Sequence, residues 1–318
     1  MTLPEYKSFS EKNQYFHSTR IETNSQFDRL YEELFEKQDH LIFRGLNESK
    51  FKNYTSAQRV WITNRLSYHI GFTDFIQRIL DNIRSQQVLR DYYLALKVVP
   101  NDLLYLSFLQ HYGAPTPMLD FTHDLDTGLF FAFDNMKPNS TRKLIGDFVS
   151  LYFIDIRECG AELVDMLAMF DSYVEPINES VYNLRLQHPE IKLDDSIIRE
   201  IDKYIRWGTQ GGFSNVPIGL YDGIFTNSTV TLKSGQTLVW ANMNIIAQKG
   251  CFINYNDSLI PLERFLKNHH YLPMMHCVDI PKVLCSYIQK RINKKKSDIY
   301  PQEEEIAKNS YSSYLKTF

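Results

Sequence analysis

Residues 110–133, QHYGAPTPMLDFTHDLDTGLFFAF, place side chains that can do chemistry beside a dense apolar run. Pro115 and Pro117 cannot continue the preceding helical pattern, because proline has no backbone N–H to donate. A polar cluster between a helix end and a stiff loop is typical of functional loops on fixed supports. A structural interpretation stays open, in which Asp120 caps a turn, Thr122 caps the next helix and LFFAF belongs to the core.

The same segment contains nitrogen and oxygen donors that suit metal ions, namely His111, Asp120, His123, Asp124 and Asp126. Such a set would favour a metal-dependent hydrolase or nuclease. The spacing fits no defined metal motif, however, so this class is the least favoured and we predict no metal here.

The elements that must position this segment follow from hydrophobic periodicity and capping residues. Apolar residues at i, i+3, i+4 and i+7 from Phe27 predict a helix, with Asn24 or Ser25 as its cap. Residues 40–46 predict a short apolar strand that ends at Gly45. Two or more helices are predicted over 56–98, separated near Gly71, and another over 101–113, capped at Asn101 and ended by Gly113.

Strands dominate the predicted second half. Aromatic and β-branched content predicts a strand over 146–156, and Gly235 marks the turn of a hairpin over 229–240. Further predicted elements are strands over 243–256 and 276–280 and helices near 159–171, 194–206 and 281–296. We therefore predict an α+β fold with a helical N-terminal half and a mixed, mostly antiparallel sheet.

Composition narrows the function classes. The 318 residues are 43% hydrophobic and 23% charged, as in ordinary globular proteins, and the formal net charge of -3 argues against a large nucleic-acid surface. Residues 1–20 are polar, and no apolar run is long enough to cross a membrane. The four cysteines show no CxxC spacing. We expect a cytoplasmic protein with reduced thiols.

The tripeptide FRG at 43–45, together with the 110–133 segment, resembles the FRG domain family. The family pattern runs roughly Q-H-Y-G-x-P-T-R-L-L-D-W-T, then an Asn-Pro pair, then A-L-Y-F-A. The residues that match it in register are Gln110, His111, Tyr112, Gly113, Pro115, Thr116, Leu119, Asp120, Thr122, Phe131 and Ala132. Weaker likenesses are Arg59 in YTSAQR, Gln248, Gly250 and Phe252 in NIIAQKGCFIN, and the SDIYPQEEEIAK segment.

The resemblance and the composition together predict the domain organisation. Residues 1–25 would form a loose N-terminal arm, and residues 26–310 a single FRG-type domain. Within that domain, 26–135 would be the motif core and 136–310 the strand-rich half that completes it. Residues 311–318 would be a C-terminal tail.

Three positions depart from the family pattern. The arginine expected after Pro-Thr is absent, because Pro117 and Met118 occupy that region. The Asn-Pro pair becomes Asp124 and Leu125, and the arginine of the later strand is Asn244. The first loss puts a phosphate-holding role at that position in doubt.

The motif order of the family is similar to that of ADP-ribosyltransferase folds, which have a split sheet. In those enzymes an early strand ending in Arg-Gly or His-Gly holds NAD, a middle element supplies Ser, Thr or Tyr, and a late strand supplies Glu or Gln. The resemblance implies these catalytic roles for Arg44, Thr122 and Gln248. It implies NAD contacts at Arg44, Gly45, His111, Tyr112, Asp120 and Phe131.

The implied activity is ADP-ribosyl transfer from NAD, or NAD cleavage, with an unidentified macromolecular target and a toxin or defence context. Arginine offers a fork of donors that matches phosphate and ribose oxygens. Cleavage of the nicotinamide-ribose bond builds positive charge on the sugar, which fixed negative charge stabilises. Gln248 cannot supply that charge, whereas Asp120 or an acid on the target can.

Interpretations without catalysis stay open. A module that binds a nucleotide or a protein partner could use the same Arg44-centred pocket, and the lack of a late-strand glutamate favours it. Arg44 can also pair with Asp120 simply to organise the fold, since buried charges persist when they are paired. His111 can complement a helix dipole, and Gln248 can satisfy a bulge at Gly250.

Overall fold

The computed structural model describes residues 2–95, 102–136, 141–159, 223–226, 243–269, 273–292 and 294–302. The helices predicted near 159–171 and 194–206 fall almost wholly outside these residues. The hairpin predicted over 229–240, the cap at Asn101 and the tail over 311–318 also lie outside them.

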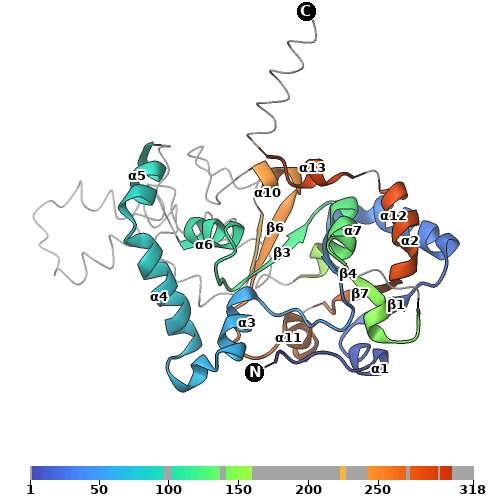
Figure 1. Ribbon diagram of the computed structural model, residues 1–318, viewed down its shortest axis with the longest axis horizontal. Helices are drawn as coiled ribbons and strands as arrows, with labels where there is room; N and C mark the ends of the chain where they lie inside the picture. The colour runs from blue at the N-terminus through green and yellow to red at the C-terminus, as the bar shows by residue number, and fades with distance from the viewer. Residues whose placement is uncertain are drawn as a thin grey trace, which may run out of the picture.

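Seven strands in the described residues form one mixed sheet (Figure 1). Their order is β1-β7-β4-β2-β3-β6-β5, and every neighbouring pair is antiparallel except β1 and β7. The strands are β1 (His17–Arg20), β2 (Leu41–Leu46), β3 (Met118–Thr122), β4 (Phe148–Asp155), β5 (Gly223–Thr226), β6 (Gly250–Asn254) and β7 (His276–Pro281).

The sheet is weakest between β2 and β3. These strands pair only at Phe43 and Thr122, whereas β2 pairs with β4 along its whole length and β3 does the same with β6. The sheet therefore consists of two well-paired groups, β1-β7-β4-β2 and β3-β6-β5, joined at one residue pair. An ADP-ribosyltransferase-like split of the sheet stays a prediction.

Helices flank the sheet, so the predicted α+β class is confirmed. Their bounds are α1 (Phe9–Lys12), α2 (Asn24–Lys37), α3 (Ser56–Thr63), α4 (Phe72–Arg84), α5 (Gln87–Ala95), α6 (Asp102–His111), α7 (Leu125–Phe133), α10 (Met243–Ala247), α11 (Leu262–Asn268), α12 (Cys285–Arg291) and α13 (Lys296–Ile299). The sheet also draws four strands, β1 to β4, from the half of the chain in which helices dominate.

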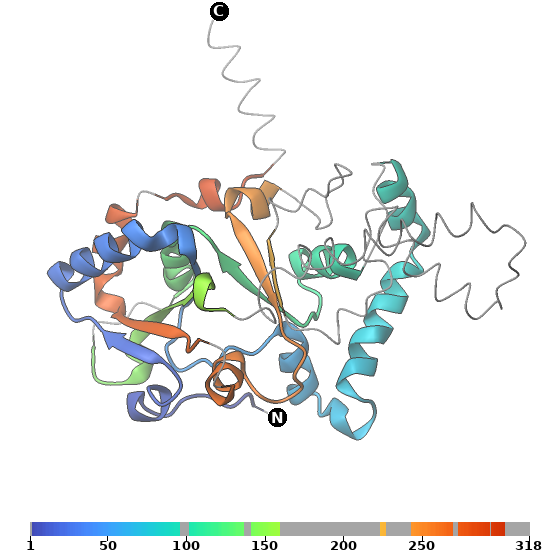
Figure 2. The same ribbon diagram turned by 180° about the vertical axis from the view of Figure 1, so that it is seen from behind.

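Three apolar clusters hold these layers together, because each strand directs alternate side chains to opposite faces. On one face Phe43 and Val149 pack under α2, α7 and α12. On the other face Ile42 and Tyr152 pack against α11 and the N-terminal segment. Figures 1 and 2 show α1 and α11 on one side of the sheet and α2, α7 and α12 on the other. A third cluster joins α3, α4 and α6 to Phe252 at the β3-β6 side.

The N-terminal segment is an integral layer of the fold, so the loose arm predicted over 1–25 is wrong. β1 extends the sheet beside β7, and Lys12 and Phe16 are buried. Lys12 Nζ lies 2.5 Å from Asp279 Oδ1 and 2.6 Å from Ser150 Oγ. The polar composition of this segment misled the prediction, because Lys12 and Tyr6 meet acidic partners, Asp279 and Glu263, that only the folded chain brings near them.

Local signals succeeded where a cap or a turn fixed the chain. Gly113 follows α6 with a φ of 74°, the left-handed conformation predicted for it. Gly71 separates α3 from α4 as predicted. The helix cap is Thr23 rather than Asn24 or Ser25, since its side chain accepts from Gln26 N in a capping box.

The strand predicted over 243–256 is correct only in its second part. Met243–Ala247 is helix α10, and the chain turns at Lys249, whose φ of 46° is left-handed, before β6 begins at Gly250. The LFFAF run lies on α7, and the segment after Pro117 forms β3. These apolar stretches are too short for periodicity to separate helix from strand.

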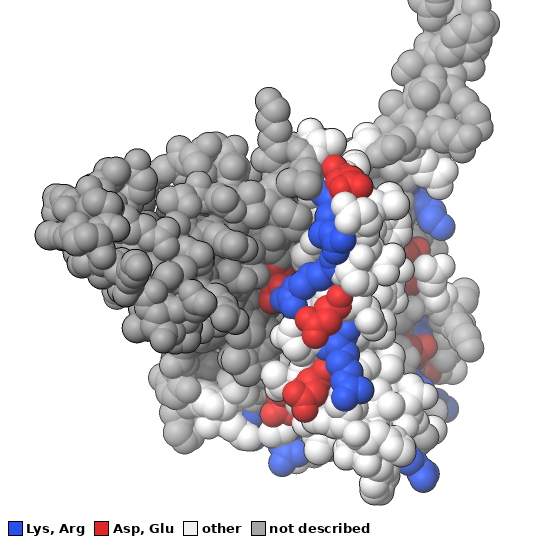
Figure 3. Space-filling model, turned by 90° about the vertical axis from the view of Figure 1, so that its left-hand side faces the viewer, with Lys and Arg blue, Asp and Glu red and all other residues white. Residues whose placement is uncertain are grey.

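The side of the molecule on which α4 and α5 lie carries both signs of charge. Figure 3 shows Lys and Arg alternating with Asp and Glu in one row on this side of the molecule. Within α4, Arg84 lies 2.7 Å from Asp81 as an ion pair of this kind. In the described part of the chain, no helix combines the length and the apolar character needed to span a membrane.

Candidate functional site

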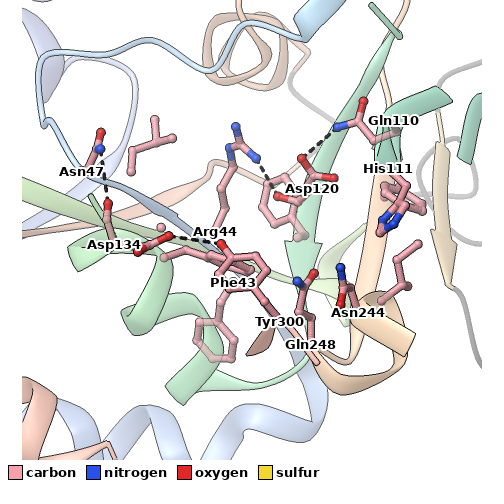
Figure 4. Close-up of a pocket in the computed structure, with 16 residues that line it drawn as sticks. Phe43, Arg44, Asn47, Gln110, His111, Asp120, Asp134, Asn244, Gln248 and Tyr300 are labelled. Carbon is pink, nitrogen blue, oxygen red and sulfur yellow. Dashed lines mark hydrogen bonds between the residues drawn. The ribbon is translucent and has the colours of Figure 1, made fainter. Parts of the chain in front are cut away.

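A cavity of about 620 Å³ opens where β2 and β3 diverge. That volume lies within the ~300–1,000 Å³ typical of small-molecule sites. Its walls come from the two strands, from the ends of α6 and α7, from α10 with β6, and from the residue after α13 (Figure 4). The residues that line it include Arg44, Gly45, Gln110, His111, Asp120, Phe131, Asp134, Gln248 and Tyr300.

Arg44 bridges the gap between the two halves of the sheet. Its Nη1 donates to the backbone carbonyl of Asp120 at 2.7 Å, and its Nε donates to Asn53 Oδ1 at 3.2 Å. Burial lowers the pKa of Arg44 to about 10, so the guanidinium stays charged at neutral pH. Both bonds go to neutral acceptors, and among the described residues Arg44 forms no ion pair with the Asp120 carboxylate.

The Asp120 carboxylate belongs to a short polar chain on the other wall. Gln110 Nε2 donates to Asp120 Oδ2 at 2.8 Å, and Thr116 Oγ1 donates to Gln110 Oε1. Asp120 is exposed and lines the cavity. The predicted simple pairing of Arg44 with this carboxylate therefore does not describe the site.

A second carboxylate, Asp134, enters the cavity from the end of α7. Tyr300 donates its hydroxyl to Asp134 Oδ2 at 3.2 Å, and Asn47 Nδ2 approaches the Asp134 carbonyl at 3.4 Å. Burial and the Asp134 charge raise the pKa of Tyr300, so this hydroxyl remains a donor. The Tyr300 ring lies 6.2 Å from the Phe131 ring in an edge-on arrangement. This wall thus offers one acid beside two rings.

Gln248 reaches the cavity, and Thr122 does not. The Gln248 side chain donates through Nε2 to Ile299 O at 3.0 Å, which holds the segment carrying Tyr300. Thr122 is 1% exposed, and its hydroxyl donates to Gln248 O at 2.6 Å and accepts from Asp124 N. Thr122 therefore fixes the α10–β6 turn and lies behind the wall.

His111 is the last residue of α6 and Tyr112 follows it, and the two side chains lie in different environments. His111 lines the cavity, and burial lowers its pKa, which favours the neutral imidazole. Tyr112 is 65% exposed and is absent from the lining. Gly45 lines the cavity and also lets α7 approach β2, since a Cβ there would lie 2.2 Å from Gly128 O.

The potential metal ligands are dispersed. Asp124 caps α7 through Thr127 and lies 3.2 Å from Lys294 Nζ, and Asp126 accepts from the Tyr31 hydroxyl at 2.8 Å. No group of three or more His, Cys, Asp or Glu side chains in the described residues is placed to hold a metal ion. This geometry gives no support to the hypothesis of a metal-dependent hydrolase or nuclease.

Six of the eight predicted site residues meet at one cavity: Arg44, Gly45, His111, Asp120, Phe131 and Gln248. Sequence reasoning missed Asp134, Tyr300 and Asn47. Tyr300 lies in the SDIYPQEEEIAK segment already noted as family-like, and Asp134 directly follows LFFAF. Proximity to those motifs was the available signal, but neither residue type is expected there from a local rule.

Comparison with known proteins identifies the central segment. Residues 39–141 match the FRG domain model, so the chain carries an FRG domain over that range. The match runs from just before β2 to beyond α7 and includes Arg44, His111, Asp120 and Phe131. Searches of the curated proteins and of the solved structures gave no match. The wider range of 26–310 stays a prediction.

Proposed function

We propose that the chain binds NAD in the Arg44 cavity and cleaves its nicotinamide-ribose bond, transferring ADP-ribose to an acceptor or to water. The observation that carries the proposal is the convergence of Arg44, Phe131 and Gln248 on one cavity. These three residues come from separate stretches of the chain. The resemblance implies NAD contacts for Arg44 and Phe131 and catalytic roles for Arg44 and Gln248. The volume and the mixture of rings and polar groups suit a nucleotide.

The guanidinium of Arg44 would hold the pyrophosphate. In the described part of the chain its hydrogen bonds use two of the five N–H groups of an arginine, so donors remain for a ligand. A guanidinium matches phosphate oxygens in a bidentate geometry. Because its present acceptors are neutral, a phosphate would be the first anion to meet it directly.

The wall formed by Asp134, Phe131 and Tyr300 would receive the nicotinamide riboside. The C–N bond breaks with its electron pair moving to the pyridinium nitrogen, which releases neutral nicotinamide. The acceptor atom then bonds to the ribose carbon and loses its proton. Asp134 supplies the negative charge that stabilises the developing sugar cation, a role Gln248 cannot fill. Gln248 would orient a ribose hydroxyl.

Asp134 suits this role better than Asp120. Asp134 is partly buried and is oriented by the Tyr300 hydroxyl, whereas Asp120 is exposed and is engaged by Gln110. A charge that water screens less acts more strongly on a nearby transition state.

A nucleotide-binding module without turnover is the second candidate. Thr122, to which the resemblance gives the middle catalytic role, is buried behind the wall. Gln248 follows a helix and replaces the glutamate that many such enzymes use. Binding through Arg44 alone would satisfy these two facts.

Release of nicotinamide from NAD separates the candidates. The purified chain and an Arg44→Ala variant with an unchanged circular dichroism spectrum are incubated with NAD, and nicotinamide is quantified by chromatography. Release that depends on Arg44 supports the enzyme. Calorimetric binding of ADP-ribose that depends on Arg44, with no release above background, supports the binding module. If the wild-type chain neither releases nicotinamide nor binds ADP-ribose, both candidates are refuted.

A further inference from the structure

A fully buried carboxylate, that of Glu263, lies behind Arg44, and Asn53 lies between the two. Glu263, near the start of α11, has no exposed surface and accepts the Tyr6 hydroxyl at 2.5 Å. The backbone N–H of Asn53 approaches its two carboxylate oxygens at 3.2 and 3.4 Å. Since buried carboxylates persist only with such partners, Glu263 depends on both contacts.

Asn53 connects this carboxylate to the cavity. Its backbone is held from both sides, because its N–H meets Glu263 and its carbonyl accepts from Leu262 N at 3.2 Å. Its side-chain Oδ1 accepts from Arg44 Nε at 3.2 Å, and the residue is fully buried. A short chain of contacts therefore runs from Tyr6 through Glu263 and Asn53 to Arg44.

The arrangement restrains Arg44 without occupying its outer donors. Only Nε is used by Asn53, which leaves the terminal nitrogens directed at the cavity and at Asp120 (Figure 4). Burial lowers the pKa of Arg44, and Glu263 is among the acids that raise it. A fork whose stem is fixed loses less rotamer freedom when it binds an oxyanion.

We propose that Glu263, Asn53 and Tyr6 are positioning residues that fix the Arg44 guanidinium for an oxyanion ligand. Glu263 and Tyr6 lie outside the 39–141 match, so the FRG arginine is completed by α11 and by the N-terminal segment. The proposal rests on the proposed function only for its binding readout.

The direct test follows the side-chain Nε–H of Arg44 by nuclear magnetic resonance in arginine-labelled protein. The resonance is assigned by its loss in Arg44→Lys. Glu263→Met removes both carboxylate oxygens of Glu263 and keeps a side chain of similar length. The exchange of the Arg44 Nε–H with water should then accelerate about tenfold, which is the effect of one lost hydrogen bond to a charged group. Asn53→Ala should do the same, and the double variant should be no faster.

Matched controls separate positioning from general destabilisation. Glu48→Met removes a carboxylate that pairs with Lys282 at 2.7 Å, and it should leave the Arg44 signal unchanged. Arg20, which pairs with Glu22, should exchange at the same rate in every variant. Should Glu263→Met fail to fold, Tyr6→Phe removes only one hydroxyl, and a rise of about threefold is then expected.

The outcomes distinguish this proposal from the proposed function. An unchanged Arg44 exchange rate in folded Glu263→Met, or in Tyr6→Phe where that variant is used, overturns the positioning chain. If the rate rises and ADP-ribose binds about tenfold more weakly by calorimetry, positioning for an oxyanion is supported. If the rate rises but the wild-type chain binds no ADP-ribose, the contacts to Arg44 stand, while the oxyanion role and the proposed function fail together.

Discussion

Two cations lie on the same face of the sheet and are held in opposite ways. Lys12 meets the Asp279 carboxylate directly at 2.5 Å, and both residues are buried. Arg44 donates to an amide oxygen and to a backbone carbonyl, and in the described residues no carboxylate bonds to it directly. Tyr152 separates the two sites, since it pairs with Arg44 across β2 and β4 and lies 5.1 Å from Lys12 Nζ.

The difference indicates what each cation is for. A buried pair whose partners satisfy each other has nothing to offer a ligand, and its removal acts on stability. A cation that is fixed by neutral acceptors keeps charge and donors for an anion. Whether a buried cation can bind a ligand therefore depends less on its position in the core than on whether a partner already neutralises its charge.

The largest expected effect is on the saturated pair. Lys12→Met leaves Asp279 buried without a cation, so the free energy of unfolding should fall by ~3–5 kcal/mol in chemical denaturation. Lys37→Met, which breaks the exposed pair with Glu33, should cost less than ~0.5 kcal/mol. A Lys12→Met change as small as this control would show that the buried pair does not anchor the N-terminal segment.

Arg44→Lys should show the reverse pattern. The variant keeps the charge and loses the fork, so NAD cleavage should fall about 10²–10³-fold, the cost of one transition-state donor. The free energy of unfolding should drop by only ~1.5–3 kcal/mol, since the lost hydrogen bonds join a charged donor to neutral acceptors and no ion pair is broken. A destabilisation equal to that of Lys12→Met, with cleavage intact, would make Arg44 a structural cation as well.

The two carboxylates of the cavity sharpen the comparison further. Asp134→Asn should lower the rate of NAD cleavage about 100-fold and leave ADP-ribose affinity nearly unchanged, because its charge acts in the transition state. Asp120→Asn should lower the rate less than about tenfold, since water screens an exposed charge. Rates are compared at saturating NAD. Equal losses in the two variants would refute the assignment of Asp134.

The smallest effect is expected at Asp124, an ion-paired carboxylate outside both sites. Burial raises its pKa, but hydrogen bonds from Thr127 and the charge of Lys294 lower it to a value below the ordinary one. A lowered folded pKa means that the contribution is present above the unfolded pKa and is lost as pH falls through the folded value.

Asp124→Asn should therefore cost about 0.5–1 kcal/mol of unfolding free energy at neutral pH, because asparagine keeps the helix cap but loses the charge that meets Lys294 and the helix N-terminus. The gap to the wild type should close in acid, as the pH falls through the lowered folded pKa of Asp124. Urea denaturation at several pH values measures the gap, and a gap independent of pH would exclude an ionised role.

The sequence predicted the parts of the site that local chemistry dictates. Gly113 ends a helix by its φ, and the strand before Gly45 follows from its apolar run. Arg44 and Asp120 were found through a short motif. Asp134 and Tyr300 were not, because 166 residues separate them and only tertiary packing brings them together. Lys12 was missed for the same reason, since its acidic partner lies near the opposite end of the chain.

A crystal structure with an NAD analogue whose nicotinamide-ribose bond cannot be cleaved tests the central claim most directly. We predict the pyrophosphate within hydrogen-bonding distance of the Arg44 guanidinium, and the nicotinamide ring against Phe131 and Tyr300. The ribose should lie beside Asp134. An analogue bound elsewhere, or an empty cavity at saturating analogue, would contradict the account.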